Sequence, residues 1–360
     1  MRETVGLSEK VHLTDLDLNQ IIEQLVAMGE APYRARQVYA AVYRSLATDF
    51  EGLTALPEPL RKRLGERFQI RTLLPRQELV SADGLTEKVL FLLRGGETIE
   101  SVLMLYAGRG DRKGRATVCA STQVGCAMGC AFCATGQMGF IRHLSAGEIV
   151  EQVLHFAREM ALQGRTITNV IFAGMGEPLA NYDNTWEAVE RLNDAEGFGL
   201  GARHMTISTV GLVPAIAKLA RERLQVGLAV SLHAPDNSTR ASLMPVNRRY
   251  PLEQLLPACA EYSAVTGRRV SFEYILIAGL NASLGHAQRL GELLQGMLCH
   301  VNLIPVNPVP GSTYRRPGRQ DVLAFQEEVR RHGVATTLRL ERGVEIQAAC
   351  GQLRARYVPA

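Results

Sequence analysis

The sequence predicts an α/β fold, an incomplete (β/α)6 barrel with a small N-terminal helical domain and a β-hairpin extension. From about residue 105 onward strand and helix patterns alternate, and each predicted strand ends in small or polar residues, as where loops gather at the carboxyl edge of a parallel barrel. Before that, helical periodicity gives way to a period of two with turn dipeptides. We expect domains at residues 1–75, 76–104 and 105–345, followed by a C-terminal segment at 346–360.

The N-terminal region contains three predicted helices. "DLDLNQIIEQLVAMG" has apolar residues at helical spacing and stops at Gly29, and "APYRARQVYAAVYRSL" has Pro32 in its first turn. "LPEPLRKRLGERF" starts with proline again. The next stretch, "QELVSADGLTEKVLFLLRGGETIESVLML", alternates around "DG" and "GG", which predicts an antiparallel hairpin.

The barrel units follow in order. "LSAGEIVEQVLHFAREM" predicts an amphipathic helix that opens with Ser145 and Glu148 at the spacing of a capping box. "TNVIFAGMGEP" predicts a buried strand that ends in a glycine-rich turn, and four later strands are predicted at "RHMTISTVG", "QVGLAVSLHAP", "VSFEYILIAG" and "HVNLIPVNPVPG". Six such units suit an incomplete barrel better than a closed eight-fold one.

Composition limits the partners and the compartment. The 360 residues are 46% hydrophobic and 21% charged, as expected of a globular protein with a large core. The N-terminus lacks a secretion signal, and no apolar run reaches the roughly 18 residues of a membrane span. We therefore expect a cytoplasmic, monomeric protein without a membrane partner. The net charge of +4 is modest, but arginine-rich loops at 109–116, 247–250 and 314–319 favour phosphate contacts over a merely solvated surface.

Four of the seven cysteines lie within "CASTQVGCAMGCAFC", which starts at Cys119. In a reducing compartment, clustered cysteines more often hold metal than form structural disulfides. Cys126, Cys130 and Cys133 form C-x3-C-x2-C, and no second cysteine or histidine pair follows to complete a zinc site. A [4Fe-4S] cube held by three thiolates leaves one iron open for an outside ligand. The spacing therefore favours an iron–sulfur cluster.

This spacing, with Phe132 in the last gap, resembles the signature of radical S-adenosylmethionine (SAM) enzymes. "RATVCASTQVGCAMGCAFCATGQMGF", "NVIFAGMGEPLANY", "ISTVG", "VSLHAP", "NLIPVNPVPG" and "AACGQL" together resemble the radical-SAM dual-specificity adenine-C2 methyltransferases, over nearly the whole chain. The resemblance implies a radical-SAM barrel, one [4Fe-4S] cluster and two SAM molecules per turnover, one as methyl donor and one as radical source. It also implies 23S rRNA (adenosine 2503) and some tRNAs (adenosine 37) as substrates, and a flavodoxin or ferredoxin system as electron donor.

The resemblance implies a mechanism that needs two further cysteines. Because carbon 2 of adenine is electrophilic, Cys350 first takes a methyl group from SAM, and a SAM-derived radical then removes hydrogen from that methyl. The methylene adds to carbon 2, Glu100 accepts the carbon-2 proton, and Cys119 attacks the Cys350 sulfur to leave a transient disulfide. The stretch "YAGRGDRKGRATV" is longer and more basic than the family's usual loop, which leaves Glu97 as the rival base.

The resemblance also implies the SAM contacts. Glycines in "GMGEP" allow close backbone approach, and Asn and Ser give directional hydrogen bonds without a charge. Met175 in the same turn is expected near Cys350. The N-terminal helices and the arginine-rich loops would bind folded RNA, with the target base turned into the pocket. The implied SAM-binding residues are Gly176, Glu177, Ser208, Ser231, Leu232, His233 and Asn307.

Three alternatives stay open at this stage. A sister enzyme methylates carbon 8 of the same rRNA adenosine and confers antibiotic resistance, but "LERGVEIQAACGQL" and "LMPVNRRYPLEQLL" look more like the C2 enzyme. A non-catalytic iron–sulfur RNA-binding protein would leave Cys119 and Cys350 dispensable, and an iron–sulfur redox sensor is the third alternative. Neither of the last two explains "GMGEP" and "AACGQL" together.

Overall fold

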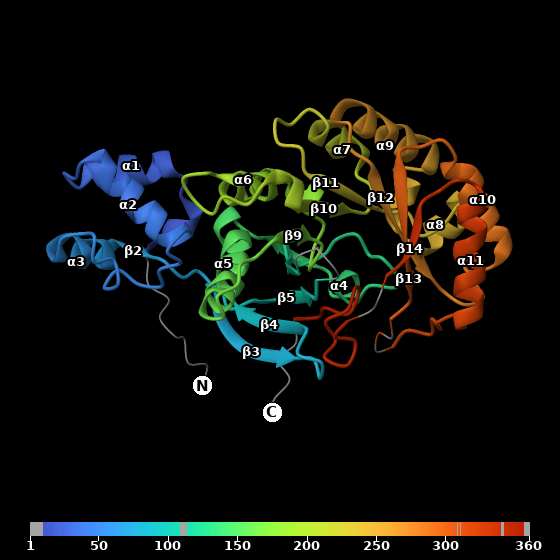
Figure 1. Cartoon of the computed structure of the whole chain (residues 1–360), viewed down its shortest axis with the longest axis horizontal. Coiled ribbons are helices and arrows are strands. Elements are labelled where there is room, and N and C mark those ends of the chain that lie inside the picture. The colour runs from blue at the N-terminus through green and yellow to red at the C-terminus, as the bar shows by residue number, and fades with distance from the viewer. Residues whose placement is uncertain (1–9, 109–113, 308, 310, 340–341, 356–360) are drawn as a thin grey trace.

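A computed structural model describes residues 10–108, 114–307, 309, 311–339 and 342–355. Most of the predicted arginine-rich loop at 109–116 lies outside these residues. The described residues form a ten-stranded mixed sheet with helices along its outer side (Figure 1), in the order β14-β13-β12-β11-β10-β9-β6-β5-β4-β3. None of the described helices combines the length and the apolar character that crossing a membrane requires.

The predicted α/β barrel is confirmed, and it contains one more parallel strand than expected. Neighbouring strands from β6 to β14 pair in parallel. The additional strand, β14, has three residues and is too short for its periodicity to be recognised. The sheet does not close, because β6 pairs on its other side with the antiparallel β5. The parallel strands are β6 (Arg115–Ala120), β9 (Asn169–Phe172), β10 (Met205–Thr209), β11 (Gly227–Ser231), β12 (Val270–Leu276), β13 (Cys299–Pro305) and β14 (Thr336–Leu338).

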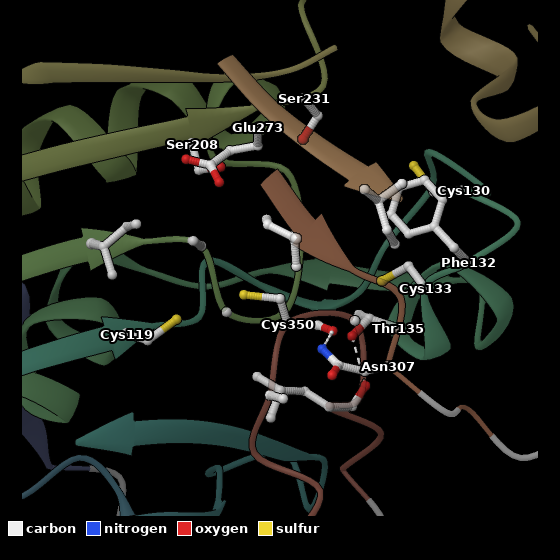
Figure 2. Close-up of a pocket in the computed structure, with 18 of the residues that line it drawn as sticks. Cys119, Cys130, Phe132, Cys133, Thr135, Ser208, Ser231, Glu273, Asn307 and Cys350 are labelled. Carbon is white, nitrogen blue, oxygen red and sulfur yellow. Dashed lines mark hydrogen bonds between the residues drawn. The ribbon is translucent and has the colours of Figure 1, made fainter. Parts of the chain in front are cut away.

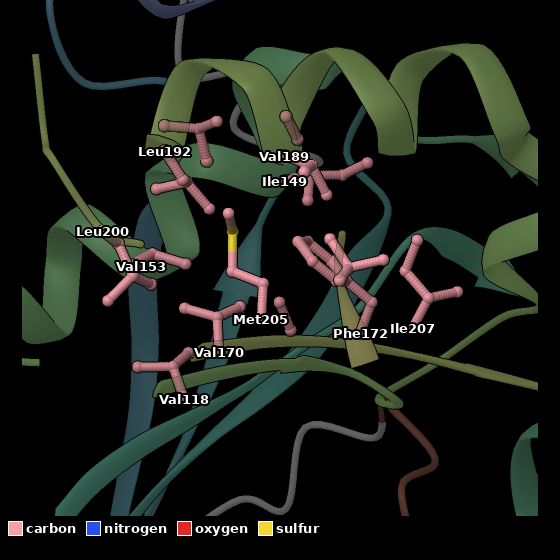
Figure 3. Packing of buried hydrophobic residues seen from close by; sticks show 14 of the residues in the cluster. Val118, Ile149, Val153, Val170, Phe172, Val189, Leu192, Leu200, Met205 and Ile207 are labelled. Carbon is pink, nitrogen blue, oxygen red and sulfur yellow. The ribbon is translucent and has the colours of Figure 1, made fainter. Parts of the chain in front are cut away.

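Helices connect these strands and cover the outer face of the sheet. The first of these helices, Ala146–Leu162, begins with the predicted capping box. The Ser145 hydroxyl accepts from the Glu148 N–H at 3.1 Å, and the Glu148 carboxylate accepts from the Ser145 N–H at 3.0 Å. Figure 3 shows the apolar side chains of strands and helices interleaved between the two layers. The helices are α5 (Ala146–Leu162), α6 (Tyr182–Asn193), α7 (Val213–Leu219), α8 (Asn237–Leu243), α9 (Leu252–Thr266), α10 (Leu284–Leu294) and α11 (Arg319–Arg331).

The N-terminal region contains the three predicted helices, α1 (Leu18–Ala27), α2 (Pro32–Tyr43) and α3 (Glu58–Arg67), with β1 (Val11–His12) paired to β2 (Phe68–Gln69). This unit is fastened to the barrel by polar contacts. The Asp15 carboxylate accepts from the Ser145 hydroxyl at 2.6 Å and from the Gly147 N–H at 3.2 Å, at the start of α5. The Tyr39 hydroxyl donates to Asp194 at 2.9 Å.

The predicted hairpin is larger than expected. β3 (Leu74–Val80), β4 (Thr86–Leu92) and β5 (Thr98–Tyr106) form an antiparallel meander with turns at the predicted "DG" and "GG". The meander continues the barrel sheet, because β5 pairs with β6 and so satisfies the edge that an open barrel leaves exposed. After β6, the short strands β7 (Gln123–Gly125) and β8 (Phe140–His143) pair and enclose the cysteine loop and α4 (Ala134–Gln137).

Candidate active site

A cavity lies at the carboxyl ends of the parallel strands, between the cysteine loop, β5, β6 and the C-terminal segment. The topology explains its position, because parallel strands bring their carboxyl ends to one edge of the sheet. Most of the predicted site residues line it, whereas Glu100, Leu232 and Met175 are not part of the lining. The predicted residues in the lining are Cys119, Cys126, Cys130, Cys133, Gly176, Glu177, Ser208, Ser231, His233, Asn307 and Cys350.

Cys126, Cys130 and Cys133 lie on the loop between β7 and α4. Among the described residues, three ligand atoms of the metal-binding types fall within 4.8 Å of one another only at the carboxylates of Glu78 and Glu159 with His155. At least two of the three sulfurs therefore lie more than 4.8 Å apart, whereas Zn–S bonds of about 2.3 Å place sulfurs within about 4 Å of each other. The spread agrees with a multi-iron cluster.

Burial controls the protonation of these thiols. It raises the pKa of Cys126 to about 11 and the pKa of Cys130 well above its ordinary value. The pKa of Cys133 is also raised by burial, against backbone hydrogen bonds from Gly136 and Thr135 that lower it. In the metal-free protein the thiols therefore hold their protons at neutral pH, and metal binding must release them.

Cys119 and Cys350 face each other across the cavity (Figure 2). Cys119 lies on β6 and Cys350 on the exposed C-terminal segment, more than 200 residues later in the chain. Burial raises the pKa of the Cys119 thiol to about 12, and the nearby Cys350 adds to this rise. Arg339, which also lines the cavity, acts in the opposite direction and lowers the pKa of Cys119.

Hydrogen bonds hold the segment that carries Cys350 against the cysteine loop. The Ala134 N–H donates to the Gly351 carbonyl at 2.8 Å, and the Thr135 hydroxyl donates to the Leu353 carbonyl at 2.7 Å. The Asn307 amide also donates to the Cys350 carbonyl, at 3.2 Å. Figure 2 shows the hydrogen bonds of Thr135 and Asn307 beside Cys350. Cys350 is thus fixed between the cysteine loop and Cys119.

The two candidate bases have different surroundings. Glu100 of β5 is buried, lies 2.8 Å from the Lys88 ammonium, and accepts from the Arg354 N–H at 2.7 Å. It shares a strand face with Val102, which lines the cavity. Glu97 lies before β5 and pairs with Arg142 at 3.2 Å, and this pairing lowers its pKa against the opposing effect of burial. Neither carboxylate belongs to the cavity lining, but Glu100 lies two residues from Val102, which does, and its role as the base stays a prediction.

The "GMGEP" turn follows β9 and packs tightly. Gly176 has φ +101°, and a side-chain carbon there would lie 2.5 Å from Gln123, so only glycine fits. The Glu177 carboxylate accepts from the N–H groups of Val210 at 2.8 Å and Leu179 at 3.0 Å. It thereby ties the turn after β9 to the turn after β10. Burial raises the pKa of Glu177 to about 7.

The remaining predicted SAM contacts follow β10, β11 and β13. His233 is buried. Burial, and to a smaller extent Arg240, lowers the pKa of His233 to about 3, so its ring is neutral. Its Nδ1 accepts from the Ile275 N–H at 3.0 Å, and the ring packs edge-on against Phe132. Asn307 Oδ1 is buried without a hydrogen-bond partner among the described residues and is therefore free to accept from a ligand. Leu232 is fully buried, and Met175 is also buried, its sulfur accepting from the N–H group of Glu100.

Sequence reasoning missed three charged residues of the lining, Glu273, Arg339 and Arg342. Glu273 lies on β12 beside Ser231 of β11, accepts from the Asn302 amide at 2.9 Å, and lies 3.7 Å from the Arg339 guanidinium. A charged residue within the apolar strand "VSFEYIL" was an available signal for Glu273. Arg339 follows β14, whose three residues gave no signal.

Comparisons with known proteins agree with this geometry. Residues 120–287 match the model of the radical SAM superfamily, and residues 11–70 match that of the ribosomal RNA large subunit methyltransferase N-terminal domain. The chain is 49% identical to the probable dual-specificity RNA methyltransferase RlmN of Chloroflexus aurantiacus, over 96% of this chain and 93% of that protein. It is 47% identical to dual-specificity RNA methyltransferase RlmN 1 of Myxococcus xanthus, over 96% and 94%. The crystal structure of a radical SAM methyltransferase from Sphaerobacter thermophilus superposes with a TM-score of 0.93 at 50% identity, over 96% of this chain and 100% of that one.

Proposed function

The chain belongs to the RlmN family of radical SAM RNA methyltransferases, and from this premise we propose that it methylates carbon 2 of adenine in RNA. The proposed substrates are 23S rRNA and some tRNAs, in keeping with the dual specificity in the names of its relatives. One observation carries the proposal: Cys119 and Cys350 face each other in the cavity that the C-x3-C-x2-C cysteines also line.

The residues present fit the cofactors of the family, a [4Fe-4S] cluster and SAM. Cys126, Cys130 and Cys133 would hold the cluster through their thiolates. Asn307, whose Oδ1 has no hydrogen-bond partner within the described part of the chain, and the strand-end residues of the lining would bind the polar groups of SAM. When bound, the cluster would supply the electron that cleaves SAM, and SAM would supply the radical that takes a hydrogen atom from a methyl group on Cys350. The cluster would also serve as acceptor for the one electron that the RNA adduct has to lose.

The chain's own residues would perform the other steps. The Cys350 thiolate attacks the methyl carbon of SAM, so that a sulfur–carbon bond forms and S-adenosylhomocysteine leaves. After the Cys350-bound carbon has joined carbon 2, Glu100 removes the carbon-2 proton, with the Lys88 ammonium stabilising the ionised carboxylate. Cys119 then attacks the Cys350 sulfur: the disulfide forms, the carbon–sulfur bond breaks, and the carbon keeps the electron pair and takes a proton to become methyl.

RNA would approach the open side of the cavity. Exposed arginines follow α8 and β13 at Arg248, Arg249, Arg315 and Arg319, where guanidinium groups suit phosphate contacts. We place RNA binding on these loops and on the N-terminal unit at residues 1–75, with the target base unstacked into the cavity. We further propose a flavodoxin or ferredoxin as electron donor, a cytoplasmic location and a monomeric protein.

The test is an oxygen-free assay with the reconstituted protein, a reductant, SAM carrying a deuterated methyl group, and either a 23S rRNA fragment or tRNA. Mass spectrometry of the digested RNA should find labelled 2-methyladenosine. Labelled 8-methyladenosine, or no methylated adenosine on either RNA, would overturn the proposal. Cys119→Ala should accumulate a covalent RNA–protein adduct and Cys350→Ala should form neither adduct nor product. Cys299→Ala, at the far end of β13, should methylate normally.

A further inference from the structure

A buried arginine stands directly behind the candidate SAM site. Arg240 of α8 is the largest fully buried side chain among the described residues, with 0% of its surface exposed. Its hydrogen bonds reach both neighbouring strand ends: the guanidinium donates to the Val210 carbonyl after β10 at 2.7 Å and to the Ser231 carbonyl at the end of β11 at 3.2 Å. It also donates to the Leu232 carbonyl at 3.2 Å. Arg240 therefore links the turn after β10 to the turn after β11, and side chains of both turns line the cavity.

The remaining N–H groups of Arg240 donate hydrogen bonds to the segment that follows α8. The guanidinium donates to the Asn247 amide oxygen at 2.8 Å and to the Tyr250 carbonyl at 3.3 Å. With the three contacts to the strand ends, this accounts for five hydrogen bonds, which matches the five N–H groups of arginine. Every one of these acceptors is uncharged. The hydrogen bonds therefore satisfy the donors of Arg240, and none of them goes to a carboxylate of the described residues.

Two thiols lie near enough to Arg240 to act on its charge. Burial lowers the pKa of Arg240 to about 10, and the groups that oppose this are Cys130 and Cys259. Cys130 is one of the three cluster cysteines, and it packs in one apolar cluster with Leu243 and Met244 at the end of α8. The Leu243 carbonyl accepts from the Ala131 N–H at 2.9 Å. The helix of Arg240 is thus in direct contact with the cysteine loop.

Electrostatics explains what such a charge requires. An isolated cation in a protein interior costs several kcal/mol unless an opposite charge lies nearby. Three thiolates around an iron–sulfur centre bring negative charge to that place, and reduction of the centre adds one more. A fixed positive charge nearby therefore stabilises the reduced form, because the reduction potential of such a cluster depends on the charges around it.

We propose that Arg240 is a positioning residue with two separable roles: it is the counter-charge that raises the reduction potential of the cluster, and it holds the SAM-facing ends of β10 and β11. The first role depends on charge, whereas the second depends on the five-donor guanidinium. Lysine keeps the first and loses most of the second, and glutamine loses both. The inference rests on the proposed cluster of the preceding section, but not on RNA methylation.

The test is a redox titration of the reconstituted protein, followed by electron paramagnetic resonance without SAM, together with equilibrium dialysis of SAM. We compare the variants at the potential where the wild-type cluster is half reduced. There, Arg240→Gln should lower the ratio of reduced to oxidised cluster at least threefold. For a one-electron couple at 59 mV per tenfold, this ratio corresponds to a fall in reduction potential of about 28 mV. Arg240→Lys should stay within 1.5-fold of wild type. Both variants should bind SAM at least fivefold more weakly.

Arg191→Gln is the matched control, since Arg191 is a buried arginine of α6 that binds the N-terminal segment and lies outside the cavity lining. It should lower the melting temperature without changing the potential. An unchanged ratio in Arg240→Gln, or an equal loss in Arg240→Lys, would overturn the charge role, and unchanged SAM affinity in both would overturn the holding role. A cluster that responds as expected in a protein that methylates no adenine would refute only the proposed function.

Discussion

Replacing Lys88 by methionine should destabilise the protein strongly, because it leaves a buried carboxylate without its counter-ion. The side chains of Lys88 and Glu100 are only 8% and 4% exposed, and their charged atoms lie 2.8 Å apart. Breaking such a pair from one side costs about 3–5 kcal/mol. The entropy of unfolding is about 2.1 cal/mol/K per residue, which for the 360-residue chain amounts to about 0.76 kcal/mol/K. The melting temperature of Lys88→Met should therefore fall by about 4–7 °C.

The assay is differential scanning calorimetry of the reduced protein, with Lys62→Met as the matched control. Lys62 and Glu58 are also 2.8 Å apart, but their side chains are 73% and 64% exposed, so Lys62→Met should shift the midpoint by less than about 1 °C. Adding Glu100→Gln to Lys88→Met should restore at least half of the loss, because the uncompensated charge is gone. A shift in Lys88→Met as small as the control's would refute the reasoning, as would single-variant losses that simply add.

Two further predictions concern the turn after β9. The folded protein binds the Glu177 proton more tightly than the unfolded chain, with a pKa of about 7 against 4.5, so this group makes stability fall as pH rises between these values. The melting temperature of wild type minus that of Glu177→Gln should drop by about 3 °C from pH 5 to pH 8. Gly176→Ala should weaken SAM binding at least tenfold in equilibrium dialysis, because the added carbon would meet Gln123 at 2.5 Å. Gly29→Ala is its control, with φ +82° and nothing within 4 Å, and it should lower only the melting temperature, by about 1–3 °C.

These two predictions have clear contradicting outcomes. A difference between wild type and Glu177→Gln that stays constant with pH, or that grows as pH rises, would show that Glu177 is already ionised at pH 5. Equal SAM affinities of Gly176→Ala and wild type would show that the turn after β9 can move away from β7 without harm to the binding site.

The fold was predictable where a pattern is local. Helical spacing and proline starts located the N-terminal helices, and the spacing of Ser145 and Glu148 located the start of α5. Strand partners are not a local property, however. The alternation in β3 to β5 predicts strands but does not say that β5 pairs with β6, so the meander was expected as a separate hairpin. The three residues of β14 are too few for any periodicity.

The same distinction applies to the candidate site. The spacing of the three cluster cysteines is local and could be recognised directly, and the resemblance located the facing pair, Cys119 and Cys350. Arg240 and Lys88 could not be recognised. In "DNSTRASL" an arginine is typical of a solvated helix, and in "TEKVLFL" a lysine is typical of the outer face of a strand. Only the folded arrangement buries both side chains. There, Lys88 balances the charge of Glu100, and Arg240 lies next to the loop that would hold the cluster.

The order of the strands also decides which strands form the two edges of the ten-stranded sheet. An open sheet has two edge strands, at which a second copy of the protein could add a strand. Here one edge strand is β14, which has three residues. The other is β3, which carries Pro75, the charged residues Arg76 and Glu78, and a register irregularity between Pro75 and Gln77. Proline, charge and a bulge each discourage strand addition. By extending the sheet past β6, the meander moves the sheet edge away from the strand that carries Cys119 to a strand that is poorly suited to pairing with another chain.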